Sequence, residues 1–293
     1  MEKSKVYFTK EISSDALVKI YESLNIELKG NVAVKLHSGE EGNQNYLKPE
    51  FVKSIIEKVK GTVVECNTAY DGARNTTEKH EKLMENHGWS KYFNVDIMDS
   101  EGPDKILEIP NGQVIKKNYV GKNIDQYNSM LVLSHFKGHP MGGYGGAIKQ
   151  LSIGVASSYG KRYIHCAGKE DGSYEEMFKT DQLKFLEAMA DAASSVHNMF
   201  KDNIVYINVM CNMSVDCDCC AKAEDPCMKD IGILASLDPI AIDQACIDLV
   251  YNSNDPGRNH LIERIESRKG IHTIEAASKL GLGNREYELI NID

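Results

Sequence analysis

Short apolar runs that alternate with longer amphipathic segments limit the fold of this chain more than any other feature. Residues 31–66 show the pattern in full, because apolar runs at 31–36 and 62–66 flank the segment Pro49–Val59. The runs predict strands, and the segment between them predicts a helix with proline in its first turn and one apolar stripe. Strand, helix and strand together predict a βαβ unit, which is typical of a parallel sheet covered by helices.

The same alternation continues to the C-terminal end. Further strands are predicted at 129–134, 204–209, 231–235 and 287–290, and helices at 181–200 and 238–250. Asp238 before Pro239 is the typical N-cap and first helical position. Around 96–120 the pattern weakens into short extended pieces, which predicts a small β-rich excursion. We therefore expect an α/β fold with a mainly parallel twisted sheet and flanking helices. Residues 1–293 are expected to form a single domain, with two lobes as the alternative, and no linker marks where a boundary would lie.

Bulk properties exclude several classes of function. A chain of 293 residues can bury a substantial core, and its net charge of −9 argues against non-specific binding to nucleic acid. No apolar run approaches the length of a membrane span, so we expect no membrane partner. The N-terminal residues show no signal-peptide pattern, and the expected location is cytoplasmic.

Five of the eight cysteines lie between Cys211 and Cys227, where soft thiolates could converge on a transition-metal ion or an iron–sulfur cluster. Cys217 and Cys219 point to the same side of an extended chain and are the main candidate ligands. Cys220 is a weaker candidate, because adjacent cysteines rarely bind one ion. Cys227, which is far enough along the chain to return to the site, and His165 are further weaker candidates. The spacing matches neither paired CxxC motifs nor a ferredoxin run. Thiol redox chemistry and inert reduced thiols therefore remain alternatives. The cysteines outside the central cluster, Cys66, Cys166, Cys211 and Cys246, are predicted to be small core residues.

The segment 135–149 combines titratable side chains with glycines after a predicted strand. His135, Lys137 and His139 are candidate acid–base groups, and the two histidines are also candidate extra metal ligands. A helix beginning near Ala147 would aim free N–H groups at an anion. The candidate anion-binding residues here are Gly142, Gly143, Gly145, Gly146 and Lys149. Neither a P-loop nor a dinucleotide fingerprint fits. The alternative is a glycine-rich turn whose histidines cap neighbouring backbone groups.

Two more polar loops follow predicted strands in the same way. Lys35 and His37 begin the loop 35–43 and are further candidate ligand-binding residues, and the loop 67–75 follows the next strand. Because the carboxyl ends of parallel strands meet at one edge of a sheet, these two loops and the segment 135–149 should together form a cleft.

Several blocks of sequence resemble the DUF362 family, a group of largely uncharacterised proteins often described as iron–sulfur or ferredoxin-related. The matching blocks, in chain order, are 35–43 with 49–50, 134–139, 142–149, 216–219, 230–236 with 238–239, and 280–283. Longer members carry a ferredoxin-like insert with two cysteine runs after a segment like 161–165, and residues 167–172 hold no such runs here. The resemblance therefore implies a short form, and it supports Cys217 and Cys219 but not Cys220 or Cys227.

Together these features predict a metal-binding or iron–sulfur protein of unknown reaction, with a ligand cleft formed by the loops 35–43, 135–149 and 216–220. A redox partner protein would fit that function. One alternative is an enzyme that acts on a small anionic metabolite through the glycine-rich segment. The other is an interaction protein without catalysis.

Overall fold

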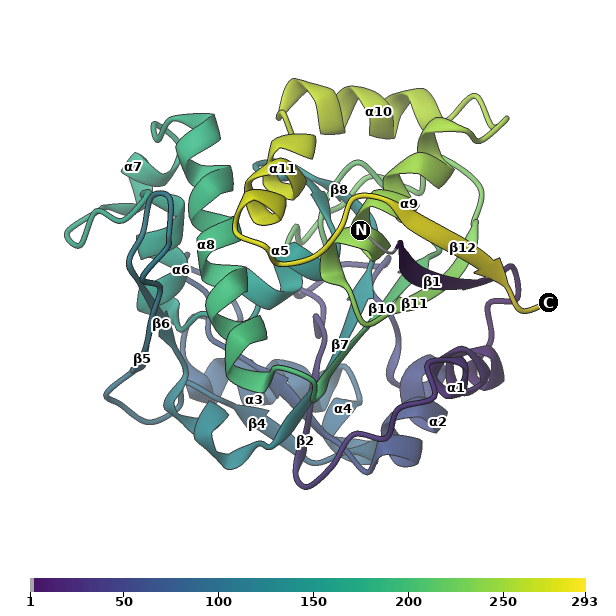
Figure 1. Cartoon of the computed structure of the whole chain (residues 1–293). Coiled ribbons are helices and arrows are strands. Elements are labelled where there is room, and N and C mark those ends of the chain that lie inside the picture. The colour runs from purple at the N-terminus through teal and green to yellow at the C-terminus, as the bar shows by residue number, and fades with distance from the viewer. Residues whose placement is uncertain (1–2) are drawn as a thin grey trace.

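The computed structural model describes residues 3–293 as an eight-stranded sheet with helices on both faces (Figure 1). The strands lie in the spatial order β12 (Tyr287–Asn291), β1 (Ser4–Thr9), β11 (Gly232–Ser236), β10 (Ile204–Met210), β7 (Ser129–His135), β2 (Val32–Lys35), β3 (Thr62–Glu65) and β4 (Val95–Ile97). From β10 to β4 all neighbours are parallel, whereas β11 runs antiparallel to both β10 and β1. The predicted α/β fold with a mainly parallel sheet is confirmed.

The helices form two layers. They are α1 (Ser14–Ser23), α2 (Pro49–Val59), α3 (Thr77–Asn86), α4 (Trp89–Tyr92), α5 (Ala147–Ser152), α6 (Ser158–His165), α7 (Tyr174–Met177), α8 (Gln182–Phe200), α9 (Pro239–Tyr251), α10 (Arg258–Ser267) and α11 (Ile271–Lys279), with a short 3-10 helix at Lys122–Gln126. Strand alternation separates two cores: Val32 and Val34 pack with α1 and α2, whereas Ala33 belongs to the core beneath α5, α8 and α9 (Figure 1). None of the helices described in residues 3–293 is long and apolar enough to cross a membrane.

Two small hairpins stand apart from the main sheet. β5 (Lys105–Glu108) pairs with β6 (Lys117–Val120), so the predicted β-rich excursion exists, although its first residues belong to β4 in the main sheet. β8 (Lys137–His139) pairs with β9 (Gly143–Gly145) directly after β7. The glycine-rich segment is therefore a hairpin that leads into α5.

The order of strands reverses between β2 and β7. From β2 the chain adds β3 and β4 on one side, whereas β7 and β10 lie on the other side. The loops that follow β2 and β7 leave the sheet at neighbouring carboxyl ends. Such a switch point is where open α/β sheets usually bind ligands.

Candidate functional site

A pocket of about 270 Å³ opens at this switch point. Its walls come from the carboxyl ends of β2 and β3, the loops that follow them, the turn between β8 and β9, α5, α6, α7 and the cysteine segment. The lining residues used below are Lys35, His37, Glu65, Arg74, His139, Met141, Lys149, Ile153, Lys161, His165, Tyr174, Met177, Phe178 and Cys219. The pocket thus contains residues from all three loops that the sequence placed at one edge.

Three side chains form a compact group of metal-ligating atoms beside this pocket. A ring nitrogen of His139 and the sulfur atoms of Cys217 and Cys219 all lie within 4.8 Å of one another, and no other such group occurs in residues 3–293. Cys217 and His139 are buried, while Cys219 is partly exposed where it lines the pocket. Cys220, Cys227 and His165 lie outside the group.

The loop 40–45 fixes the shape of the cysteine segment. The backbone N–H of Glu40 donates to the carbonyl of Asp218 at 2.9 Å, and the side-chain amide of Asn43 donates to the carbonyl of Cys220 at 2.8 Å. The backbone N–H of Cys220 also closes a turn onto the carbonyl of Cys217 at 2.9 Å. These bonds hold the two candidate thiol ligands in place without engaging their sulfur atoms.

Both thiols are protonated near neutral pH. The neighbouring thiol of Cys219 and burial raise the pKa of Cys217 to about 11. The pKa of Cys219 is also raised: the contact with Cys217 lowers it, but the contact with Cys220 and burial outweigh that effect. Since only thiolates bind metal ions, binding here must release the thiol protons.

The imidazole of His139 is neutral, because burial and the charge of Lys149 lower its pKa to about 4. Its Nδ1 accepts hydrogen bonds from the backbone N–H groups of Met141 at 3.1 Å and Gly142 at 2.8 Å. The ring proton therefore lies on Nε2, the nitrogen left for a metal ion or for a sulfur atom. His139 does cap neighbouring backbone groups, as the turn alternative in the sequence analysis predicted.

His135 and Lys137 do not reach the pocket, although they looked equivalent to His139 in the sequence. Nδ1 of His135 lies 2.9 Å from Asp218 and its Nε2 lies 2.6 Å from the carbonyl of Cys211. Both partners are acceptors, so neither ring nitrogen has a lone pair free for a metal ion. The ammonium of Lys137 donates to Asp218 at 2.7 Å. Burial favours the neutral form of Asp218, but the charges of His135 and Lys137 outweigh it and hold its pKa well below the usual range. His135 and Lys137 thus form a buried ion cluster with Asp218, and the candidate roles of both as acid–base groups, and of His135 as a ligand, stay predictions.

The glycines do not line the pocket either, and their contact with a ligand stays a prediction. Asp243 of α9 accepts hydrogen bonds from the N–H groups of Ala147 at 2.7 Å and Ile148 at 3.0 Å. An internal carboxylate thus occupies the helix start that was expected to receive an external anion. A Cβ atom at Gly146 would lie 2.5 Å from Oδ1 of Asp243, and one at Gly143 would lie 2.9 Å from Cα of Gly270. Gly142 and Gly145 belong to the same hairpin, but the nearest atoms to a Cβ would lie at 3.5 Å and 3.4 Å, which are ordinary contacts.

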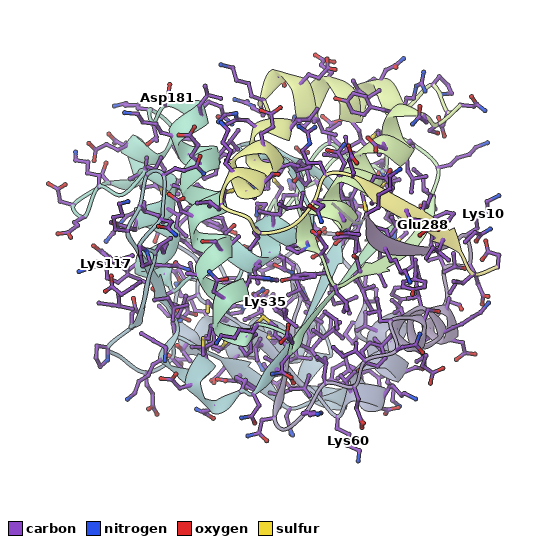
Figure 2. The ribbon with its side chains drawn as sticks, in the orientation of Figure 1. Lys10, Lys35, Lys60, Lys117, Asp181 and Glu288 are labelled. Carbon is purple, nitrogen blue, oxygen red and sulfur yellow. The ribbon has the colours of Figure 1, made fainter. Side chains whose placement is uncertain are left out.

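Lys35 is the most deeply buried cation at the pocket. Figure 2 shows it within the outline of the molecule, whereas Lys10, Lys60 and Lys117 lie at the periphery. The ammonium of Lys35 donates to Glu65 at 2.8 Å, to the carbonyl of Leu36 and to Gln150 at 3.3 Å. All three donors of the ammonium are thus used inside the protein, and the role of Lys35 in ligand binding stays a prediction.

Glu65 and Arg74 continue this ion network on the floor of the pocket. Burial alone would raise the pKa of Glu65, but the charge of Lys35 and other nearby cations outweigh it and hold it well below the usual range. Arg74 donates to Glu40 at 3.2 Å and lies 3.7 Å from Glu65. His37, which lines the pocket, accepts a hydrogen bond at Nδ1 from the N–H of Gly39 at 3.0 Å, and burial and Arg74 keep its pKa well below the usual range.

Three further residues of α5 and α6 face the pocket. Lys149, a predicted ligand-binding residue, lines it and has no hydrogen-bond or ion-pair partner for its ammonium within residues 3–293. The sequence did not predict that Lys161 would be a cation of the pocket or that His165 would be a base there. Their spacing of four residues, which places both on one face of a helix, was the available signal.

A family model described as "Domain of unknown function (DUF362)" matches residues 32–248, most of the chain. The chain belongs to the DUF362 family. The resemblance found in the sequence blocks is thereby confirmed. The DUF362 match runs from β2 into α9 and includes every loop that lines the pocket.

Comparisons with other proteins do not assign a function to this member of the DUF362 family. No curated protein matches the sequence. Among solved structures, the lactate racemase apoprotein from Thermoanaerobacterium thermosaccharolyticum is similar, with a TM-score of 0.40, 15% identity, and coverage of 70% of this chain and 50% of that one. A structural-genomics target from Thermotoga maritima is similar with a TM-score of 0.43, 12% identity, and coverage of 92% and 59%. The chain thus spans only 50% and 59% of the length of these two proteins.

Proposed function

We propose that this protein binds one transition-metal ion beside the pocket, with the thiolates of Cys217 and Cys219 and Nε2 of His139 as protein ligands. The observation that carries the proposal is that a ring nitrogen of His139 and the two sulfur atoms lie within 4.8 Å of one another. Thiolate and imidazole ligands together suit zinc and other borderline or soft ions. An ordinary iron–sulfur cluster requires four thiolates, so the group supports a single ion better than a cluster.

The position of the group supports a site that is open on one side. Cys219 and His139 both line the pocket, so a bound ion would face it. Metal sites with three protein ligands and one open position are typical of catalytic rather than structural zinc. A molecule in the pocket could therefore occupy the fourth coordination position.

The hydrogen bonds of His139 set one condition on this ligand set. Because Nδ1 accepts from two backbone N–H groups, the ring proton must move from Nε2 to Nδ1, and these two hydrogen bonds must break, before Nε2 can bind the ion. Binding should then release about two protons per ion near neutral pH, both from thiols, since histidine binds metal as the neutral ring. Titration calorimetry in buffers of different ionisation enthalpy measures this number.

The proposal is tested by anaerobic purification followed by elemental analysis and by titration of the metal-free protein with Co²⁺. We expect one ion per chain and sulfur-to-cobalt charge-transfer absorption. Both should be lost in Cys217→Ser and Cys219→Ser and retained in Cys227→Ser, whose thiol donates to the carbonyl of Met213 outside the group. A protein that binds no ion under these conditions, or that binds it equally in Cys217→Ser, would refute the metal site.

A further inference from the structure

The pocket carries excess positive charge in a chain whose net charge is −9. Its lining includes four cations, Lys35, Arg74, Lys149 and Lys161, but only one acidic residue, Glu65. Lys35 pairs with Glu65, and Arg74 pairs with Glu40. The charges of Lys149 and Lys161 therefore remain without an acidic partner among residues 3–293.

Lys149 lies on α5 and Lys161 lies on α6, and both act on the imidazole ring of His165. Lys161 donates to the carbonyls of Ala156 at 2.6 Å and Cys66 at 3.4 Å, which orients its ammonium without neutralising it. The charges of Lys149 and Lys161 both act on His165, whose pKa is lowered to about 4, mainly by burial. His165 donates from Nδ1 to the carbonyl of Lys161 at 2.7 Å, so its Nε2 is an acceptor at the pocket.

The pocket also has apolar lining and is partly open. Met141, Ile153 and Met177 line it, and Tyr174 and Phe178 lie at its rim with exposed fractions of 50% and 61%. These two rings pack edge to face with their centroids 5.2 Å apart. Large exposed aromatic side chains at the rim of a pocket are typical of a surface that contacts a ligand.

We propose that the pocket binds a small organic carboxylate with an apolar body. The carboxylate lies between Lys149 and Lys161, and the apolar body lies against Ile153, Met177 and Phe178. A volume of about 270 Å³ is near the lower end of organic-ligand pockets, so the molecule is small. The groups that usually hold phosphate are engaged elsewhere: Asp243 occupies the start of α5, and Arg74 is bound to Glu40 and Tyr70.

The test is direct binding of two probe series to metal-free protein by calorimetry or ligand-observed NMR. One series runs from benzoate to 4-phenylbutyrate, and the other contains straight-chain carboxylates from butanoate to octanoate. We expect saturable binding of at least one member, and binding about tenfold weaker or more for the alcohol of the same body, for acetate and for phenyl phosphate. Failure of both series, or tighter binding of phenyl phosphate or of the alcohol, would overturn the carboxylate assignment.

Variants locate the binding site. Lys149→Ala should weaken binding about tenfold or more, whereas Lys117→Ala, which removes an exposed lysine on β6, should leave it unchanged. Phe178→Ala should weaken binding, whereas Leu289→Ala, which removes another exposed apolar side chain, should not. Equal binding by Lys149→Ala and wild type would refute the site. Because the protein is metal-free throughout, this outcome is independent of the proposed metal ion.

Discussion

The glycine-rich segment 142–146 and the cysteine segment 216–220 both lie beyond the carboxyl ends of neighbouring strands, yet they use their polar groups in opposite ways. In the glycine segment, Asp243 accepts from the free N–H groups at the start of α5, from the side-chain amide of Asn208 and from the hydroxyl of Tyr144. In the cysteine segment, backbone groups are satisfied by the loop 40–45, while two thiols are left beside the pocket.

The difference shows why a glycine-rich segment beside a strand is weak support for a ligand site. Close backbone approach serves packing equally well, and here it brings a carboxylate of α9 into contact with α5. Convergent side chains without internal partners point to a ligand more strongly. The comparison predicts that changes in the two segments affect different properties of the protein.

The largest expected effect is on metal affinity. Cys217→Ser should weaken Co²⁺ binding by more than about 100-fold, since even outer-shell partners of metal sites contribute up to about that factor. The free energy of unfolding of the metal-free protein should change little, because serine is nearly isosteric. Asp243→Ala, compared at a temperature where it is folded, should keep the wild-type affinity. If Cys217→Ser instead destabilised the metal-free protein and left Co²⁺ affinity intact, the two segments would not differ as described.

The next effect is on stability. Asp243→Ala leaves several buried donors without an acceptor and should lower the free energy of unfolding by about 3–5 kcal/mol. Urea denaturation of metal-free protein measures it. The matched control is Asp181→Ala, which removes the exposed N-cap of α8 and should cost about 1 kcal/mol (Figure 2). Equal losses in the two variants would show that Asp243 is not the internal partner of α5.

The smallest expected effect is an opposite pH response of His139, the proposed third ligand, and Asp243, the internal partner of α5. His139 has a folded-state pKa of about 4, so the stability it contributes is present above its unfolded pKa of about 6.5 and is lost as the pH falls. Burial raises the pKa of Asp243 to about 6, so its contribution is present below its unfolded pKa and is lost as the pH rises through 6. From pH 7 to pH 5, about 2 kcal/mol is therefore lost through His139 and about 1 kcal/mol is gained through Asp243.

Urea denaturation of metal-free variants at pH 7 and pH 5 separates these contributions. His139→Gln should lose less stability on acidification than wild type, and Asp243→Asn should lose more. If both variants lost more stability than wild type between pH 7 and pH 5, or both lost less, the assigned protonation states would be contradicted.

Local pattern was sufficient to predict six strands of the main sheet and the three longest helices, α2, α8 and α9. The helix at Pro49–Val59 has the predicted bounds, and Asp238 caps α9 through the N–H groups of Ile240 and Ala241. The antiparallel direction of β11 could not be predicted, because an apolar run does not encode strand direction. The short strand β4 could not be predicted either, because it lies in a segment of weak pattern and its partner, β3, is distant in the sequence.

The candidate site was predictable only in part. The meeting of the loops at one edge follows from strand order. That His135 is buried in an ion cluster while His139 lines the pocket depends on Asp218, which is more than 70 residues away. Likewise, the engagement of Lys35 by Glu65 and the freedom of Lys149 are set by tertiary contacts. A sequence shows which side chains come near the pocket, and packing decides which of them keep an unused donor or lone pair.

X-ray absorption spectroscopy of the zinc-loaded protein tests the central claim most directly. We expect two sulfur ligands at about 2.3 Å and at least one nitrogen ligand at about 2.0 Å, with the sulfur shell reduced by half in Cys219→Ser. A first shell of oxygen and nitrogen alone, or a sulfur shell unchanged in Cys219→Ser, would contradict it.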